Sequence, residues 1–186
     1  PNLKPENIRQ YEIGYSISST KEKFNINQTF YNSKLKNEIN GSASHPEGGY
    51  TAENIDSNSY RKGLETKLRY KINKHSYASI SYNYVDSTEY NSTSGIQQAE
   101  VRRPRNILNI NYDNSFSSNL HISSNIFYSS KVKDVDFSSS PFQHVYMNSY
   151  FLFNTALNYN IDSKNKVSLV FKNIFNREYN EVNGYN

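Results

Sequence analysis

The chain has 186 residues, a net charge of +4 and a mean hydropathy of −0.86. It contains no cysteine, which excludes disulfides, thiolate metal sites and cysteine nucleophiles. It also has no apolar run of about 18 residues, which excludes a transmembrane helix. Because its Lys and Arg residues are scattered rather than clustered, the positive charge gives little support to nucleic-acid binding.

Apolar and polar side chains alternate with a period of two from about residue 9 to residue 173, which predicts β-strands with one apolar face. In chain order we expect eight strands, at residues 8–18, 23–39, 58–73, 76–88, 104–114, 118–131, 148–160 and 165–173. The two faces differ most clearly in the third predicted strand. Its apolar face carries Leu64, Leu68, Tyr70 and Ile72, and its opposite face carries Gly63, Glu65, Lys67, Arg69 and Lys71. The sixth and seventh each have one polar exception on the apolar parity, Ser124 and Thr155.

The length of these segments indicates a membrane environment. They exceed the roughly 5 to 6 residues usual in soluble sheets, and match or exceed the roughly 9 to 11 that a tilted strand needs to cross hydrocarbon. Next to lipid every backbone group needs a partner, so the sheet must close on itself, with the charged parity lining a polar lumen. The 17 Tyr and 10 Phe suit aromatic girdles at the two interfaces. The predicted fold is all-β: the wall of an antiparallel transmembrane β-barrel.

The connections between strands alternate in length, as in outer-membrane barrels with short periplasmic turns and long external loops. The long connections, 40–57, 89–103 and 132–147, and the segment from Asn176 onward are therefore expected at the extracellular mouth. The chain opens on Pro1 without a secretory signal and ends in a polar loop after a strand that needs a partner. We therefore expect part of a larger barrel, present as an open curved sheet with two free edges.

Several motifs resemble those of the TonB-dependent outer-membrane transporters, and are most similar to the cobalamin branch. They are Pro1–Glu6 with Tyr11–Gly14, Gly63–Glu65, Ser81–Asp86, Arg102-Arg103, Ser138–Pro141, and Lys172–Tyr179 with Gly184-Tyr185. The resemblance follows the order and spacing of essentially the whole chain. It implies that residues 1–186 are the C-terminal part of a 22-stranded barrel, without the plug, the first part of the barrel and the last strand.

The resemblance also implies a function: active import of cobalamin or another corrinoid across the outer membrane of a Gram-negative bacterium. The chain would contact the lipid bilayer, and TonB would act through the missing plug. No bond of the substrate is broken, so no enzyme activity, catalytic residue, metal or cofactor is expected. By resemblance Arg102, Phe137 and Tyr185 would contact the ligand, although the family's usual residue at the position of Phe137 is Tyr. A corrin ring offers apolar faces to aromatic side chains and amide carbonyls to a guanidinium.

Other interpretations of these residues remain open. Phe137 and Tyr185 could be girdle or loop-packing aromatics, and Arg102 could pair with a carboxylate, while Arg103 and Arg105 suit the lumen wall. The alternative function is a siderophore or haem receptor, with a passive porin and an outer-membrane lipid hydrolase less supported.

The sequence offers only weak support for the groups that these alternatives would need. Asp134 and Asp136 are spaced like a pair of calcium ligands, but no glycine-centred loop accompanies them. For haem, His45 and His144 fall in loops. For a hydrolase, His121 lies on the inward parity, which is the wrong face for lipid hydrolysis.

Overall fold

The computed structural model describes residues 3–44, 50–55, 57–91 and 95–184. These residues contain thirteen strands and no helix. The strands are β1 (Asn7–Ser18), β2 (Phe24–Lys36), β3 (Ile39–Ser44), β4 (Tyr50–Asn54), β5 (Asn58–Lys71), β6 (Ser76–Asn91), β7 (Ile96–Ala99), β8 (Asn106–Ser115), β9 (Leu120–Ser129), β10 (Val132–Asp136), β11 (Gln143–Met147), β12 (Tyr150–Asn160) and β13 (Lys166–Phe171). Within the described ranges, no helix is therefore long and apolar enough to span a bilayer.

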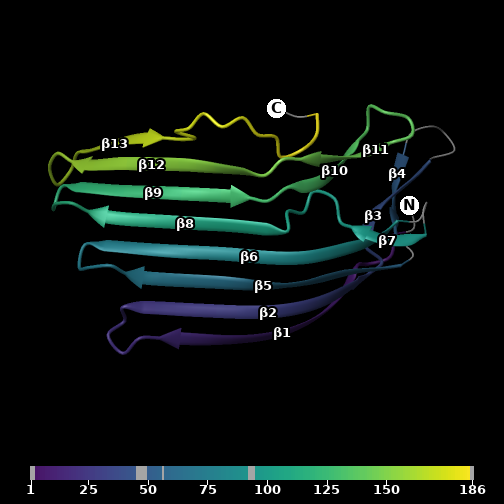
Figure 1. Cartoon of the computed structure of the whole chain (residues 1–186), viewed down its shortest axis with the longest axis horizontal. Helices are drawn as coiled ribbons and strands as arrows, with labels where there is room; N and C mark the ends of the chain where they lie inside the picture. Colours follow the sequence, from purple (N-terminus) through teal and green to yellow (C-terminus); the bar gives the residue numbers. More distant parts are fainter. Residues whose placement is uncertain (1–2, 45–49, 56, 92–94, 185–186) are drawn as a thin grey trace.

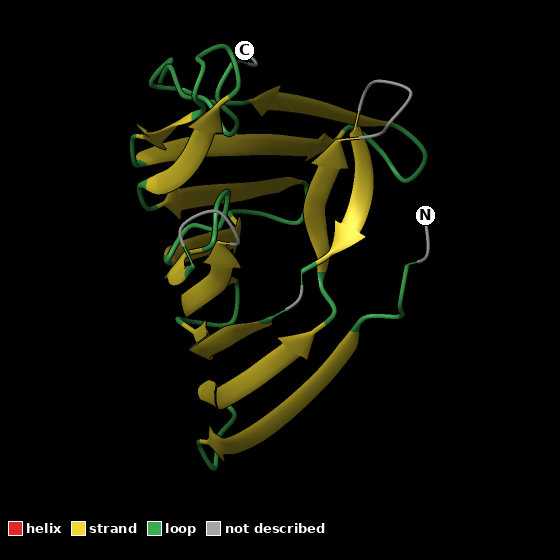
Figure 2. Ribbon diagram, turned by 90° about the vertical axis from the view of Figure 1, so that its right-hand side faces the viewer, coloured by secondary structure: helices red, strands yellow, loops and turns green. Residues whose placement is uncertain are grey.

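The eight long strands form one antiparallel sheet in the order β1-β2-β5-β6-β8-β9-β12-β13 (Figure 1). Each corresponds to one predicted strand, with boundaries displaced by at most three residues. The sheet is curved and does not close, because β1 and β13 lie at its opposite edges (Figure 2). The predicted open curved sheet is thus confirmed.

The long connections all lie at one end of the sheet, on the right in Figure 1, and the short turns at the other. They contain five short strands that the sequence analysis missed. Strands β3 and β4 form one hairpin, β10 and β11 form another, and β7 pairs with β6. Each of the five has four to six residues, which is too short for alternation to stand out in a polar loop.

The strand register aligns apolar side chains across the sheet. One such row crosses seven strands through directly opposed residues: Ile17, Ile26, Leu68, Ile80, Ile110, Ile126 and Phe153. Only two large hydrophobic side chains of the described residues are buried, Leu35 and Tyr150. Burying a large apolar side chain, rather than leaving it in water, contributes about 1.5–3 kcal/mol. No protein layer covers this apolar row in the described residues, so its apolar character fits a sheet whose outer face contacts lipid.

The polar exceptions on the apolar face are matched with one another. Ser124 and Thr155 stand directly opposite each other on β9 and β12, and their hydroxyl oxygens are 3.0 Å apart. Gln28 and Thr66 are likewise opposed, and the Thr66 hydroxyl donates to Gln28 Oε1 over 2.7 Å. Because hydrocarbon offers no hydrogen bonds, pairing lets these side chains lie on a lipid-facing wall.

Candidate functional site

At the loop end of the sheet, Asp134 joins three separate segments. Its side chain, on β10, is fully buried. Its Oδ1 accepts hydrogen bonds from Arg102 Nε and from the Val135 backbone N–H, both 2.8 Å, and its Oδ2 accepts one from the Asn183 backbone N–H over 2.7 Å. The carboxylate therefore holds together the connection after β7, the β10–β11 hairpin and the C-terminal segment. We call Asp134, Arg102 and Asn183 the loop clasp.

The electrostatics of the loop clasp favour an ionised carboxylate. Burial alone would raise the pKa of Asp134. The hydrogen bonds from Asn183, Arg102 and Val135 outweigh this desolvation and lower the pKa below its usual range. The clasp is thus fully formed at neutral pH.

Arg102 lies in the loop clasp in a constrained conformation. Its φ of 57° is in the left-handed region, and its backbone N–H donates to Lys133 O over 2.7 Å. Its guanidinium lies 5.8 Å from the centre of the Phe137 ring. The structure therefore brings together two of the three predicted ligand contacts. Arg102 also pairs with a carboxylate, as the alternative interpretation expected, but its side chain is still 43% exposed.

Phe137 lies at the tip of the β10–β11 hairpin. It is 62% exposed and packs edge to face against Phe142, which is 57% exposed, with ring centres 5.3 Å apart. Asp136 accepts hydrogen bonds from the backbone and hydroxyl of Ser138 and so stabilises the turn beneath these rings. The third predicted contact, Tyr185, lies outside the described residues, as does His45.

A second ionic cluster lies at the same end of the sheet. The Arg61 guanidinium on β5 is 2.8 Å from Glu38 Oε1 and 2.8 Å from Glu100 Oε1, and Arg103 Nη2 is 2.7 Å from Glu100 Oε1. Burial opposes ionisation of Glu100, but the hydrogen bonds from Arg61 and Arg103 dominate and lower its pKa. This cluster was not predicted from the sequence, because Glu38, Arg61 and Glu100 are far apart in the chain. Glu38, Glu100 and Arg103 also lie between strands, where alternation does not indicate the direction of a side chain.

The structure also shows the surroundings of His121, the candidate for a lipid hydrolase, and of the carboxylates and histidines that could bind a metal. His121 Nε2 is 3.1 Å from the Ser123 hydroxyl, and its Nδ1 is 3.3 Å from that of Ser115. The sequence did not identify these serines as partners, but they lie with His121 on the inner face, away from the lipid. Among the described residues no three His, Asp or Glu side chains group as a metal site.

Long antiparallel strands with an apolar outer face, a polar inner face and long loops at one end define the wall of a membrane β-barrel. The sequence matches the family described as "TonB dependent receptor-like, beta-barrel" over residues 1–176, and the chain belongs to this family. It is therefore a protein of the outer membrane of Gram-negative bacteria. The predicted fold, family and location are confirmed, whereas membership of the cobalamin branch is not supported.

Solved structures with a similar fold include three siderophore receptors. The ferric-catecholate import receptor Fiu of E. coli K12 aligns with a TM-score of 0.73 and 14% identity, over 97% of this chain and 25% of its own. The pyoverdine receptor FpvA of Pseudomonas aeruginosa PAO1 gives 0.76 and 17%, over 98% and 27%. The ferric enterobactin receptor PfeA of P. aeruginosa gives 0.70 and 20%, over 94% and 26%. The chain thus spans about a quarter of these receptors. No curated protein matches it.

Proposed function

We propose that this chain forms part of the wall and mouth of a TonB-dependent receptor that imports a ferric siderophore. Its membership of the receptor family carries the proposal, and the siderophore receptors among structures of similar fold support the choice of substrate. This choice replaces cobalamin, which the sequence motifs alone favoured. Residues 1–186 would be the C-terminal part of a 22-stranded barrel, and a plug outside this segment would contact TonB.

The chemistry of the mouth supports an anionic ligand with aromatic groups. Two cation–aromatic pairs lie on the loops: Arg102 over Phe137, and Lys131, whose Nζ is 4.1 Å from the centre of the exposed Tyr146 ring. Such pairs present positive charge and ring surface together, which suits the anionic oxygens and rings of a ferric catecholate. The amide side chains of a corrinoid are neutral, so the guanidinium would meet them as a hydrogen-bond donor.

Within this proposal the residues have distinct roles. Arg102 is a ligand contact through the part of its guanidinium that is open to solvent, while Asp134 holds it in place. Phe137 supplies an exposed ring face or edge. Tyr185 remains a proposed contact on the basis of the family resemblance.

Equilibrium binding to outer membranes that carry the full-length parent protein tests the substrate. Radiolabelled ferric enterobactin and ferripyoverdine would be titrated separately, with cobalamin and haem as competitors. We expect saturable binding of a ferric siderophore that excess cobalamin and haem do not displace. Saturable binding of cobalamin, with no siderophore binding, would overturn the proposal.

A further inference from the structure

Charged side chains on the outer, lipid-facing side of the sheet are confined to its loop end. Among the described residues of the eight long strands, this side carries five charged residues: Arg9, Lys34, Lys36, Lys62 and Asp86. All five lie toward the loop end of four neighbouring strands, β1, β2, β5 and β6 (Figure 1). Four of the five are basic. We call Lys34, Lys36 and Lys62 the basic patch, and Arg9 lies beside it on the edge strand.

The strand register brings these positive charges close together. Lys34 is directly opposed to Arg9 on one side and to Tyr60 on the other, and Lys62 is two residues from Tyr60 on β5. Diagonal neighbours of this kind are about 7–8 Å apart, and Lys36 is about 7 Å from Lys34 along β2. Like charges directly opposite each other destabilise a sheet. An anion bound between them would remove this repulsion.

The protein supplies too few carboxylates to neutralise the basic patch. Lys62 Nζ is 3.5 Å from Asp86 Oδ2, but Arg105 Nη2 shares the same carboxylate, at 2.9 Å from its Oδ1. Within the described parts of the chain, neither Lys34 nor Lys36 forms an ion pair with a carboxylate. The patch therefore keeps uncompensated positive charge.

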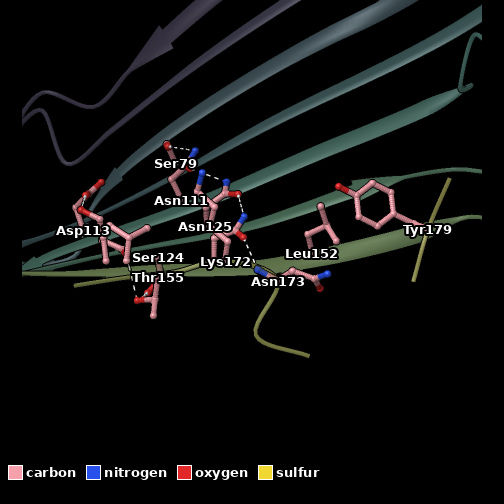
Figure 3. Close-up of a pocket in the computed structure, with 14 residues that line it drawn as sticks. Ser79, Asn111, Asp113, Ser124, Asn125, Leu152, Thr155, Lys172, Asn173 and Tyr179 are labelled. Carbon is pink, nitrogen blue, oxygen red and sulfur yellow. Dashed lines mark hydrogen bonds between the residues drawn. The ribbon is translucent and has the colours of Figure 1, made fainter. Parts of the chain in front are cut away.

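The basic patch lies on a part of the sheet that the rest of the barrel does not cover. Figure 3 shows the inner face, where Asn125 Nδ2 donates to Asn111 Oδ1 over 2.8 Å, and a plug and the opposite wall of the barrel would face this side. The patch is on the other side of the sheet. β2 and β5 each lie between two other strands, so the strands that complete the barrel add no neighbour to them (Figure 2).

The distance along β2 places the basic patch at the surface of the bilayer. From Phe24, near the short turns, to Lys34 the strand runs ten residues, or about 34 Å at 3.4 Å per residue. A strand tilt of about 40° reduces this to about 26 Å across the membrane, which matches the apolar band of about 25 Å in outer-membrane barrels. Lys34 Nζ also lies 5.7 Å from the centre of the Tyr60 ring, which suits the aromatic girdle at this interface. The patch is therefore level with the lipid headgroups of the external leaflet.

We propose that the basic patch binds the phosphate groups of a phosphorylated lipid headgroup in the external leaflet. Lysine ammonium groups bind phosphate as point charges, and each basic residue near an anionic membrane surface strengthens lipid binding. The bound phosphates would also offset the repulsion between Lys34 and Arg9. This inference requires only that the sheet faces lipid, and it is independent of which ligand the receptor imports.

The test titrates the assembled full-length parent protein, in an uncharged detergent, with labelled diphosphoryl lipid A. The variant Lys34→Gln/Lys36→Gln removes two charges from the patch, and Lys34→Arg/Lys36→Arg keeps them. The matched control is Lys67→Gln/Lys71→Gln, which removes two charges from the inner face of β5. Dephosphorylated lipid A shows what the acyl chains contribute, and competition by inorganic phosphate shows whether a free anion occupies the patch.

We expect Lys34→Gln/Lys36→Gln to weaken binding of diphosphoryl lipid A about 25-fold, or about fivefold for each charge. The arginine variant and the inner-face control should stay within about twofold of the parent, and dephosphorylated lipid A should not distinguish the parent from the glutamine variant. Equal affinity of the parent and the glutamine variant for diphosphoryl lipid A would overturn the inference, as would an equal loss in the control. Displacement of the lipid by millimolar inorganic phosphate would also overturn it, because the patch would then bind a free anion.

Discussion

Replacing Asp134 by Asn should release the loop clasp while leaving the barrel wall intact. Asp134 is fully buried and accepts hydrogen bonds from Arg102, Val135 and Asn183. A hydrogen bond to a charged group contributes about 1.5–3 kcal/mol. The Arg102 side chain is 43% exposed, so water replaces much of that bond, and the buried contact with Asn183 dominates the loss. We estimate a local cost of about 2 kcal/mol, which corresponds to about 30-fold more frequent opening.

Amide hydrogen exchange of the assembled receptor measures this opening directly. In Asp134→Asn the Asn183 amide should exchange about 30-fold faster, while amides in the centre of β9 and β12 keep their parent rates. Asp136→Asn is the matched control, since Asp136 stabilises only the hairpin turn at Ser138. Unchanged exchange at Asn183 would refute the argument that Asp134 holds the C-terminal segment in place.

The same carboxylate predicts a pH dependence for the clasp. Because the folded pKa of Asp134 is lowered, its contribution is complete above the unfolded pKa of about 3.9 and is lost as pH falls through the lower folded value. Exchange at Asn183, corrected for the intrinsic effect of pH, should therefore be constant from pH 7 to pH 5. Opening of the clasp at pH 5–6 would contradict the assigned ionisation.

Three further variants probe the wall and the mouth. Gly63→Ala should sharply reduce the amount of assembled barrel on heat-modifiability gels, since the new Cβ would overlap the backbone of β6; normal assembly would contradict this packing. Arg102→Ala should weaken siderophore binding about tenfold, whereas Arg105→Ala, a control that pairs with Asp86, should not; equal affinities would exclude Arg102 as a contact. The double variant Ser124→Ala/Thr155→Val should keep or raise the unfolding midpoint in urea, because both partners of a lipid-facing hydrogen bond become apolar; a marked loss would place them elsewhere than in lipid.

The wall could be predicted from the sequence because it obeys one local rule. Alternation over more than ten residues, as in 58–73, identifies both a strand and its two faces. The outer face must be apolar because it contacts lipid, so its composition does not depend on residues elsewhere in the chain. The same rule marked Ser124 and Thr155 as exceptions. It could not show that they stand opposite each other, because pairing depends on the register between two strands.

The arrangement of the loops depends on contacts between distant residues, which no local pattern in the sequence predicts. Arg102 and Asp134 are 32 residues apart, and their meeting requires the β10–β11 hairpin, which the sequence did not reveal. Only the family resemblance suggested that Arg102 and Phe137 contact the same ligand. In the structure the Arg102 guanidinium lies 5.8 Å from the centre of the Phe137 ring. The inward-facing Asn111, Asn125 and Asn154 are likewise ordinary in the sequence, and only the register brings their side chains into hydrogen-bond contact.

Energised uptake by cells that express the full-length parent protein would show whether the receptor imports its ligand actively. Labelled ferric siderophore would be supplied to cells with and without TonB, and with and without a protonophore. We expect accumulation well above the number of surface binding sites only in energised cells that have TonB, and only saturable binding in the others. Equal accumulation in all conditions would show a passive pore, and would contradict import by a TonB-dependent receptor.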